Sequence, residues 1–156
     1  MAEKRESTKT ISYNRAARHE YFVDESFEAG IELTGTEVKS LRAGTVSLKD
    51  SWVDVGTGEL IVKQLHISPY EHGNIFNRDP MRERRLLMHR REINYLFGKV
   101  KQQGCTLIPL SLYFKGSRVK VQLGLCRGKK LYDKREDMAA RDAKRAIDRA
   151  MKEHLR

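Results

Sequence analysis

The chain has 156 residues, of which 39% are hydrophobic and 33% charged, and its net charge at neutral pH is +10. This length fits one domain with an appendage and argues against two full domains. The positive charge favours a polyanionic partner, either nucleic acid or an anionic membrane surface, although charge can also serve solubility alone.

The first part of the chain is expected to hold a disordered arm, strands and a short helix. Residues 1–12 are polar and lack periodicity, which predicts disorder. Residues 22–35 favour strand, with an interruption at Gly30. A short helix should follow, with Thr36 as its N-cap and Gly44 as its end.

The middle of the chain predicts a hairpin, a loop and a longer helix. Residues 50–67 hold two apolar-rich segments around a Gly-containing turn, which is typical of a β-hairpin. A loop is expected over residues 68–85. Residues 89–104 carry apolar side chains at positions i, i+3, i+4 and i+7, which predicts a helix ended by Gly104.

Two segments with alternating polarity follow, at residues 106–114 and 118–125. A period of two predicts strands with one buried and one wet face, as in an antiparallel sheet or barrel. Pro109 cannot donate a backbone hydrogen bond, so its strand should lie at an edge or carry a bulge. These elements predict a mainly β fold, a small antiparallel barrel flanked by short helices over residues 13–127.

The C-terminal segment has a different composition. Residues 127–156 hold 11 Lys or Arg and 6 Asp or Glu, so about a fifth of the chain carries half of the net charge. Its composition favours helix from about Asp133, but its apolar stripe is thin, and isolated helices of this length are marginal in water. We expect a tail over residues 128–156 that is mobile when free and helical only against a partner.

Signals for catalysis and metal binding are weak. The histidines are scattered, and residues 124–130 match a phosphate-binding loop only loosely. Cys105 and Cys126 have no metal-ligand spacing, so we expect buried thiols in a reducing cytoplasm. We expect no enzymatic activity, no metal and no cofactor. No apolar run approaches the roughly 18 residues of a membrane span, so no membrane partner is expected.

Basic residues stand beside aromatic and apolar ones at two places. Arg15, Arg18 and His19 precede two aromatic residues, and a second basic group surrounds residues 86–88. This second group comprises Arg82, Arg84, Arg85, Arg90 and Arg91. Cations neutralise phosphates and rings stack on unpaired bases, so the pattern favours RNA binding. The alternative is a solvated face over core aromatic residues. The aromatic residues expected to be core are Phe22, Phe97 and Phe114.

Five stretches match one bacterial family in order along the chain. They are NRAARHEYFVDESFEAGIELTGTEVKSLRAG (residues 14–44), LKDSW (48–52), HISPY (66–70), RLLMHRREI (85–93) and GKKLYDKRE (128–136). Together they resemble the SsrA-binding proteins, also called small protein B, and GTEVKSLR is a highly specific part of the match.

The resemblance implies a cytoplasmic, non-enzymatic protein built on an oligonucleotide-binding-type (OB-fold) barrel. It implies binding to the tRNA-like domain of transfer-messenger RNA and entry, with elongation factor Tu, into ribosomes stalled on messages without a stop codon. Trans-translation then adds a degradation tag and releases the ribosome. We expect the free protein to be a monomer. Rival interpretations are an RNA-modifying enzyme and a structural protein of the ribosome.

The resemblance also implies candidate RNA contacts. Glu28, Leu87, His89 and Lys120 match positions implicated in RNA binding. The Glu28 carboxylate repels phosphate, so it accepts hydrogen bonds from base edges or holds a neighbouring cation. Leu87 is either an RNA contact or core, and His89 stands where some relatives have Asn. RNA contact and structural pairing both stay open for Arg15, Arg18, His19, Lys39 and Arg42.

In the tail, the resemblance implies a set of residues that reach the vacant decoding site and mRNA channel. The set is Gly128, Lys129, Lys130, Tyr132, Asp133, Lys134 and Arg135. Gly128 would act as a swivel, and the two lysines would meet phosphate. Tyr132 fills a position that is His in some members, and either ring can stack on a ribosomal RNA base.

Overall fold

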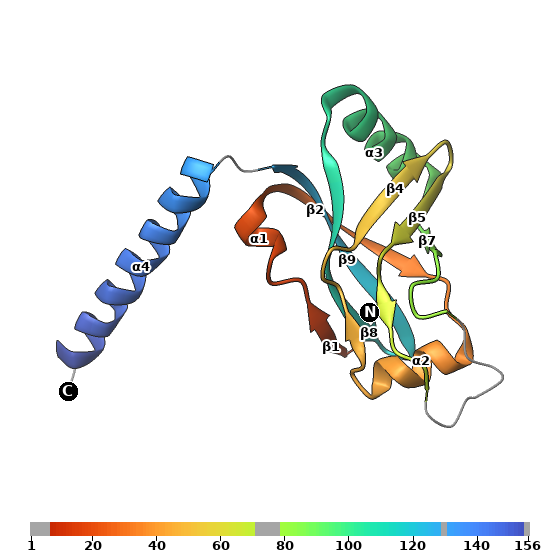
Figure 1. The fold of residues 1–156 in the computed structure, drawn as a ribbon, viewed down its shortest axis with the longest axis horizontal. Helices are drawn as coiled ribbons and strands as arrows, with labels where there is room; N and C mark the ends of the chain where they lie inside the picture. Colours follow the sequence, from red (N-terminus) through yellow and green to blue (C-terminus); the bar gives the residue numbers. More distant parts are fainter. Residues whose placement is uncertain (1–6, 71–78, 129–130, 155–156) are drawn as a thin grey trace, which may run out of the picture.

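The computed structural model describes residues 7–70, 79–128 and 131–154, without the side chains of residues 131–134, 137 and 154 (Figure 1). The strands are β1 (Thr8–Tyr13), β2 (Tyr21–Ile31), β3 (Val46–Ser47), β4 (Trp52–Gly56), β5 (Glu59–Lys63), β6 (His66–Ile67), β7 (Arg84–Leu87), β8 (Thr106–Lys115) and β9 (Arg118–Gly128). The helices are α1 (Ala17–Glu20), α2 (Gly35–Arg42), α3 (Arg90–Gln103) and α4 (Leu131–His154).

The main sheet is antiparallel and curls into a partly closed barrel. Its strand order is β1-β8-β4-β5-β7-β2-β9, and β9 also pairs with β8. The β8–β9 ladder is long, whereas β4 meets β8 only at the pair Val53–Leu107. The predicted fold class, mainly β with flanking helices, is confirmed.

The core lies inside the barrel, between the strands and α3. Leu60, Leu96, Leu112 and Leu123 are completely buried there, and each such burial contributes roughly 1.5–3 kcal/mol. Figure 1 shows α3 at one end of the barrel and α2 at the other. Phe97 and Phe114 pack against the core while partly exposed.

A second, smaller cluster lies on the opposite face of β8 and β9. Ala17 of α1 packs there with Ile108, Leu110 and Cys126. The expectation of one wet face along these strands is therefore wrong in this region, because α1 covers it. Both cysteines are buried free thiols, as predicted.

Local signals predicted several boundaries correctly. Gly104 ends α3 in the left-handed conformation with φ 68°. The β4–β5 hairpin turns through Gly58 at φ 77°. The β8–β9 register shifts between Pro109 and Ser111, which confirms the predicted bulge at the proline.

Three expectations about the N-terminal part need correction. Residues 8–12 are not disordered, because β1 pairs with β8 through Thr8–Tyr13; residues 1–6 lie outside the described part. Strand β2 runs through Gly30 without interruption. The N-cap of α2 is Thr34, which forms a reciprocal capping box with Glu37, and Thr36 lies inside the helix.

The last helix, α4, extends away from the barrel in Figure 1. Its described side chains are exposed, including the apolar Met138, Ile147 and Met151. Arg141 Nη2 of this helix donates to the Arg18 carbonyl oxygen of α1 at 3.3 Å. Mobility of the free tail stays a prediction. Among the described residues, no helix has the length and apolar character needed to cross a membrane.

Candidate nucleic-acid interface

One row of residues crosses five strands on the outside of the barrel. Leu87 of β7 pairs with Gly30 of β2, which pairs with Lys120 of β9. Lys120 pairs in turn with Tyr113 of β8, and Tyr113 with Thr10 of β1. Directly opposed residues of an antiparallel ladder share one face, so these five positions face the same side.

Gly30 leaves a hollow between its two neighbours. An added Cβ at Gly30 would lie 3.3 Å from the Leu87 Cβ, so the absence of a side chain keeps this place open. The hollow is lined by Leu87, Gly30, Lys120 and Arg118, among others. Leu87 is 48% exposed, so it is not part of the core, and its RNA contact stays a prediction.

A second row runs beside the first. Glu28 pairs with Gln122, Gln122 with Ser111, and Ser111 with Tyr13. The Ser111 hydroxyl donates to Gln122 Oε1 at 3.2 Å. Residues of both rows line one open hollow of about 470 Å³. We call these two rows, with Lys115 and Arg118, the outer face.

Glu28 organises the centre of the outer face. Its carboxylate accepts a short hydrogen bond from the Tyr113 hydroxyl. It also forms an ion pair with Lys115, whose Nζ lies 3.2 Å from Glu28 Oε1. The Tyr113 bond, followed by Lys115, holds the pKa of Glu28 below its usual range. Of the two roles expected for Glu28, the structure shows that it holds a neighbouring cation, Lys115. It also holds the aromatic side chain of Tyr113.

The outer face continues toward α1. Arg15 and Arg18 are exposed and line a hollow together with Tyr13 and Gln122 of the second row. His19 is half-buried on α1 beside them. The structure thus brings the predicted residues of the N-terminal motif to the same surface as Glu28 and Lys120.

Other predicted RNA contacts lie apart from the two rows. His89 is exposed at the N-cap of α3, two residues beyond Leu87. Lys39 lies over the Tyr70 ring at 5.5 Å from its centroid. Arg42 lines a separate hollow near β1 with Lys9. All three are exposed, so RNA contact stays a prediction for them.

The second basic group contains structural residues. Arg84 is completely buried, and its Nε donates to Glu37 Oε2 at 2.5 Å while Nη1 donates to the Leu65 carbonyl at 2.8 Å. Arg82 Nη2 donates to Glu37 Oε1 at 2.5 Å. Arg84 therefore cannot bind RNA, which corrects the expectation for this residue. Arg85, like the first residues of α3, stays exposed.

Burial opposes the charged form of Glu37, but hydrogen bonds from Arg82, the Thr34 amide and Arg84 outweigh it. The pKa of Glu37 is accordingly lowered. The buried cluster of Glu37, Arg82 and Arg84 connects α2 to β7. Because β7 ends at Leu87, this cluster stabilises the strand that carries one residue of the outer face.

In the tail, Gly128 is the last residue of β9 and Arg135 is exposed on α4. Lys129 and Lys130 lie outside the described residues, as do the side chains of Tyr132, Asp133 and Lys134. The expected decoding-site roles of these residues therefore stay predictions.

The chemistry of the outer face suits RNA. It offers Lys and Arg for phosphates, Tyr rings for stacking, and hydroxyl and amide groups for hydrogen bonds. In the described part of the chain, no group of three or more His, Cys, Asp or Glu gathers as a metal site. Burial raises the pKa of the Cys126 thiol to about 11, so this cysteine is not an activated nucleophile.

Sequence reasoning missed Tyr113, Lys115, Gln122 and Tyr13 as members of this surface. The alternation along residues 106–114 did place Tyr113 opposite the apolar positions. That signal alone could have marked its ring as outward-facing.

Comparisons with known proteins agree with this surface chemistry. A family model described as SmpB protein matches residues 11–153. The SsrA-binding protein of Acetivibrio thermocellus is 59% identical over 152 residues, covering 97% of this chain and 99% of the relative. That of Clostridium perfringens is 60% identical over 153 residues, covering 98% of each chain.

A solved structure is similar as well. Its description is "tmRNA-SmpB: a journey to the center of the bacterial ribosome", and the matched chain is 50% identical with a TM-score of 0.67. The match covers 80% of this chain and 92% of that chain. The chain therefore belongs to the SmpB family of SsrA-binding proteins.

Proposed function

We propose that the protein binds the tRNA-like domain of transfer-messenger RNA and delivers it to stalled ribosomes for trans-translation. The relatives are SsrA-binding proteins, and the similar solved chain belongs to a complex of tmRNA and SmpB with the ribosome. Membership of the family, with near-complete coverage of both chains, supports the same partners for this protein.

The observation that carries the proposal is the row from Leu87 through Gly30 to Lys120. It places an exposed apolar side chain and a cation on either side of a position without a side chain. A nucleotide can approach the backbone there, with its sugar or base against Leu87 and its phosphate near Lys120. Glu28 adds an oriented ring and a second cation beside it.

The protein acts as a non-enzymatic cofactor of a cytoplasmic process. It binds as a monomer, and elongation factor Tu joins the delivery complex. The tail from residue 128 onward occupies the vacant decoding site and mRNA channel. The helical backbone of Leu131–His154 and the net positive charge of residues 127–156 support binding of the tail at a site lined by RNA.

The experiment is to purify the tagged full chain from its cells at low and moderate salt and to sequence the RNA that copurifies. Transfer-messenger RNA should dominate, and the variant Lys120→Glu should recover much less of it. Mixed RNA without enrichment would contradict the proposal. Stoichiometric retention on salt-washed, non-stalled ribosomes would instead indicate a structural ribosomal protein.

A further inference from the structure

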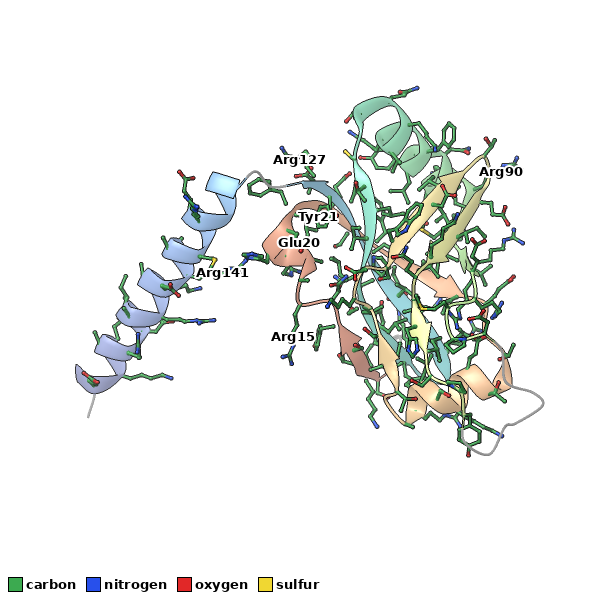
Figure 2. All side chains as sticks on the ribbon, in the orientation of Figure 1. Arg15, Glu20, Tyr21, Arg90, Arg127 and Arg141 are labelled. Carbon is green, nitrogen blue, oxygen red and sulfur yellow. The ribbon has the colours of Figure 1, made fainter. Side chains whose placement is uncertain are left out.

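The chain leaves the barrel at the last rungs of the β2–β9 ladder. Phe22 pairs with Arg127 and Tyr21 with Gly128, after which the described part resumes at α4. Figure 2 shows Arg127 at this exit, with Tyr21 on the neighbouring strand. Whatever restrains Arg127 therefore restrains the end of the barrel from which the tail starts.

Arg127 is held on two sides although its side chain is 61% exposed. Its Nε donates to Asp24 Oδ2 at 2.7 Å, and its Nη2 donates to Asp24 Oδ1 at 3.0 Å. Its guanidinium carbon lies 5.5 Å from the centroid of the Phe22 ring. A two-pronged bond plus a stacked ring restrains both the plane and the position of the guanidinium.

The position of Asp24 depends on a bulge in β2. The β2–β9 register shifts between Val23 and Glu25, so Asp24 has no partner of its own in the ladder. Bulges re-aim side chains, and this one accompanies a carboxylate that meets Arg127 across the ladder. The Arg127 hydrogen bond holds the pKa of Asp24 below its usual range, so the pair stays charged at neutral pH.

These three residues lie at the exit, away from the two rows of the outer face. Neither Asp24 nor Phe22 lines any hollow of that face. Asp24 is also acidic, which disfavours a phosphate contact. Resting on the proposed function, we propose that Asp24 and Phe22 hold Arg127 in place as the anchor of the tail. They would thus act as positioning residues for the entry of the tail into the ribosome.

The test uses the full chain with Asp24→Asn, Arg127→Lys and the double variant. Asn removes the charge, while Lys keeps the charge and loses the two-pronged geometry. Two quantities are measured: the affinity for the tRNA-like domain of transfer-messenger RNA, and the single-round rate of peptidyl transfer to that RNA on stalled ribosomes. Asp54→Asn is the matched control, since it removes an exposed carboxylate of β4 that lies 3.5 Å from Lys63.

RNA affinity should be unchanged in both single variants, while the transfer rate should fall roughly two- to fivefold, the range that exposed pairs carry. The double variant should be no slower than the worse single variant, because both remove one interaction. As a third readout, ¹⁵N relaxation of free protein should show faster motion of the Arg127 and Gly128 amides in Asp24→Asn, with Leu125 unaffected.

Wild-type transfer rates in both single variants, together with unchanged relaxation in Asp24→Asn, would overturn the inference. So would a matching loss of RNA affinity, which would place Asp24 in the RNA interface. Failure of the unsubstituted protein to bind the RNA or support transfer would instead contradict the proposed function, so the two failures are distinguishable.

Discussion

Leu87 and Lys120 lie on opposite sides of Gly30, each paired with it across an antiparallel ladder. In the proposed RNA contact, the side chains of Leu87 and Lys120 contribute to the affinity in different ways. Lys120→Gln should lower the affinity and reduce the slope of log affinity against log salt by about 0.7–0.9, because one phosphate contact is lost. Leu87→Ala should lower the affinity roughly fivefold, about 1 kcal/mol of apolar contact, with the slope unchanged.

Fluorescence anisotropy at several salt concentrations measures both quantities. The control is Lys101→Gln, which removes an equal charge from the exposed end of α3. An equal change of slope in Lys120→Gln and Lys101→Gln would show that Lys120 acts only through net charge.

For a substitution of Glu28, side-chain geometry and net charge predict opposite changes in RNA affinity. Glu28→Gln removes a negative charge, so simple electrostatics predicts tighter RNA binding. We expect weaker binding, roughly fivefold, because the carboxylate oxygens Oε2 and Oε1 accept from Tyr113 and Lys115 respectively, and Gln keeps one acceptor oxygen for these two donors. The control Glu59→Gln, at the exposed tip of the β4–β5 hairpin, should leave affinity equal or slightly higher. Tighter binding by Glu28→Gln would refute the orienting role.

The buried cluster of Glu37, Arg82 and Arg84 predicts an acid dependence of stability. The pKa of Glu37 is lowered from its ordinary value of 4.5. A group with a depressed folded pKa stabilises the fold above its unfolded pKa, and this stabilisation is lost as the pH falls through the folded pKa. The contribution should therefore be complete at pH 7 and decline below about pH 4.5.

Urea unfolding measures this effect. Glu37→Gln should cost about 3–5 kcal/mol at pH 7, because it leaves the buried charge of Arg84 without its negative counter-charge. Its loss of stability between pH 7 and about pH 3 should be smaller than that of the unsubstituted protein. The control Glu83→Gln, 65% exposed and 3.6 Å from Lys63, should change stability by less than about 0.5 kcal/mol. Equal costs for both variants would contradict the structural role of Glu37.

A truncation after Gly128 separates the barrel from the tail. It removes α4 and leaves the outer face and the β2–β9 ladder complete. RNA affinity should stay within about threefold, because half of the excess charge remains in the barrel, while tagging on stalled ribosomes should be abolished. A filter-binding assay and a tagging assay on the same preparation measure the two. A large loss of affinity would show that the tail captures RNA first.

Local patterns were sufficient where an element stabilises itself. The periodicity of α3 and its glycine end predicted its limits, as did the glycine turn of β4–β5. Strand β1 was missed because residues 8–13 have no clear apolar alternation, and their pairing partner in β8 is about a hundred residues away. The capping box of Thr34 and Glu37 was present in the sequence as T-x-x-E but was attributed to the wrong threonine.

The sequence predicted several of the residues that belong to the candidate site, but it did not predict how these residues are arranged in space. Leu87 and Lys120 followed from the family resemblance, but their meeting at Gly30 depends on strand register. Tyr113 and Glu28 are 85 positions apart, so no local pattern could join them. Arg84 resembled an RNA contact because of its basic neighbours, although its alternation with Leu86 in β7 placed it on the buried side.

The most direct measurement compares the affinity of the full chain for the tRNA-like domain of transfer-messenger RNA with that for random RNA of equal length. Both are measured at one salt concentration, because the phosphate contribution depends on salt. The account predicts tighter binding of the tRNA-like domain by about a hundredfold or more, and loss of most of that preference in the double variant Leu87→Ala, Lys120→Gln. Equal affinity for the two RNAs would contradict it.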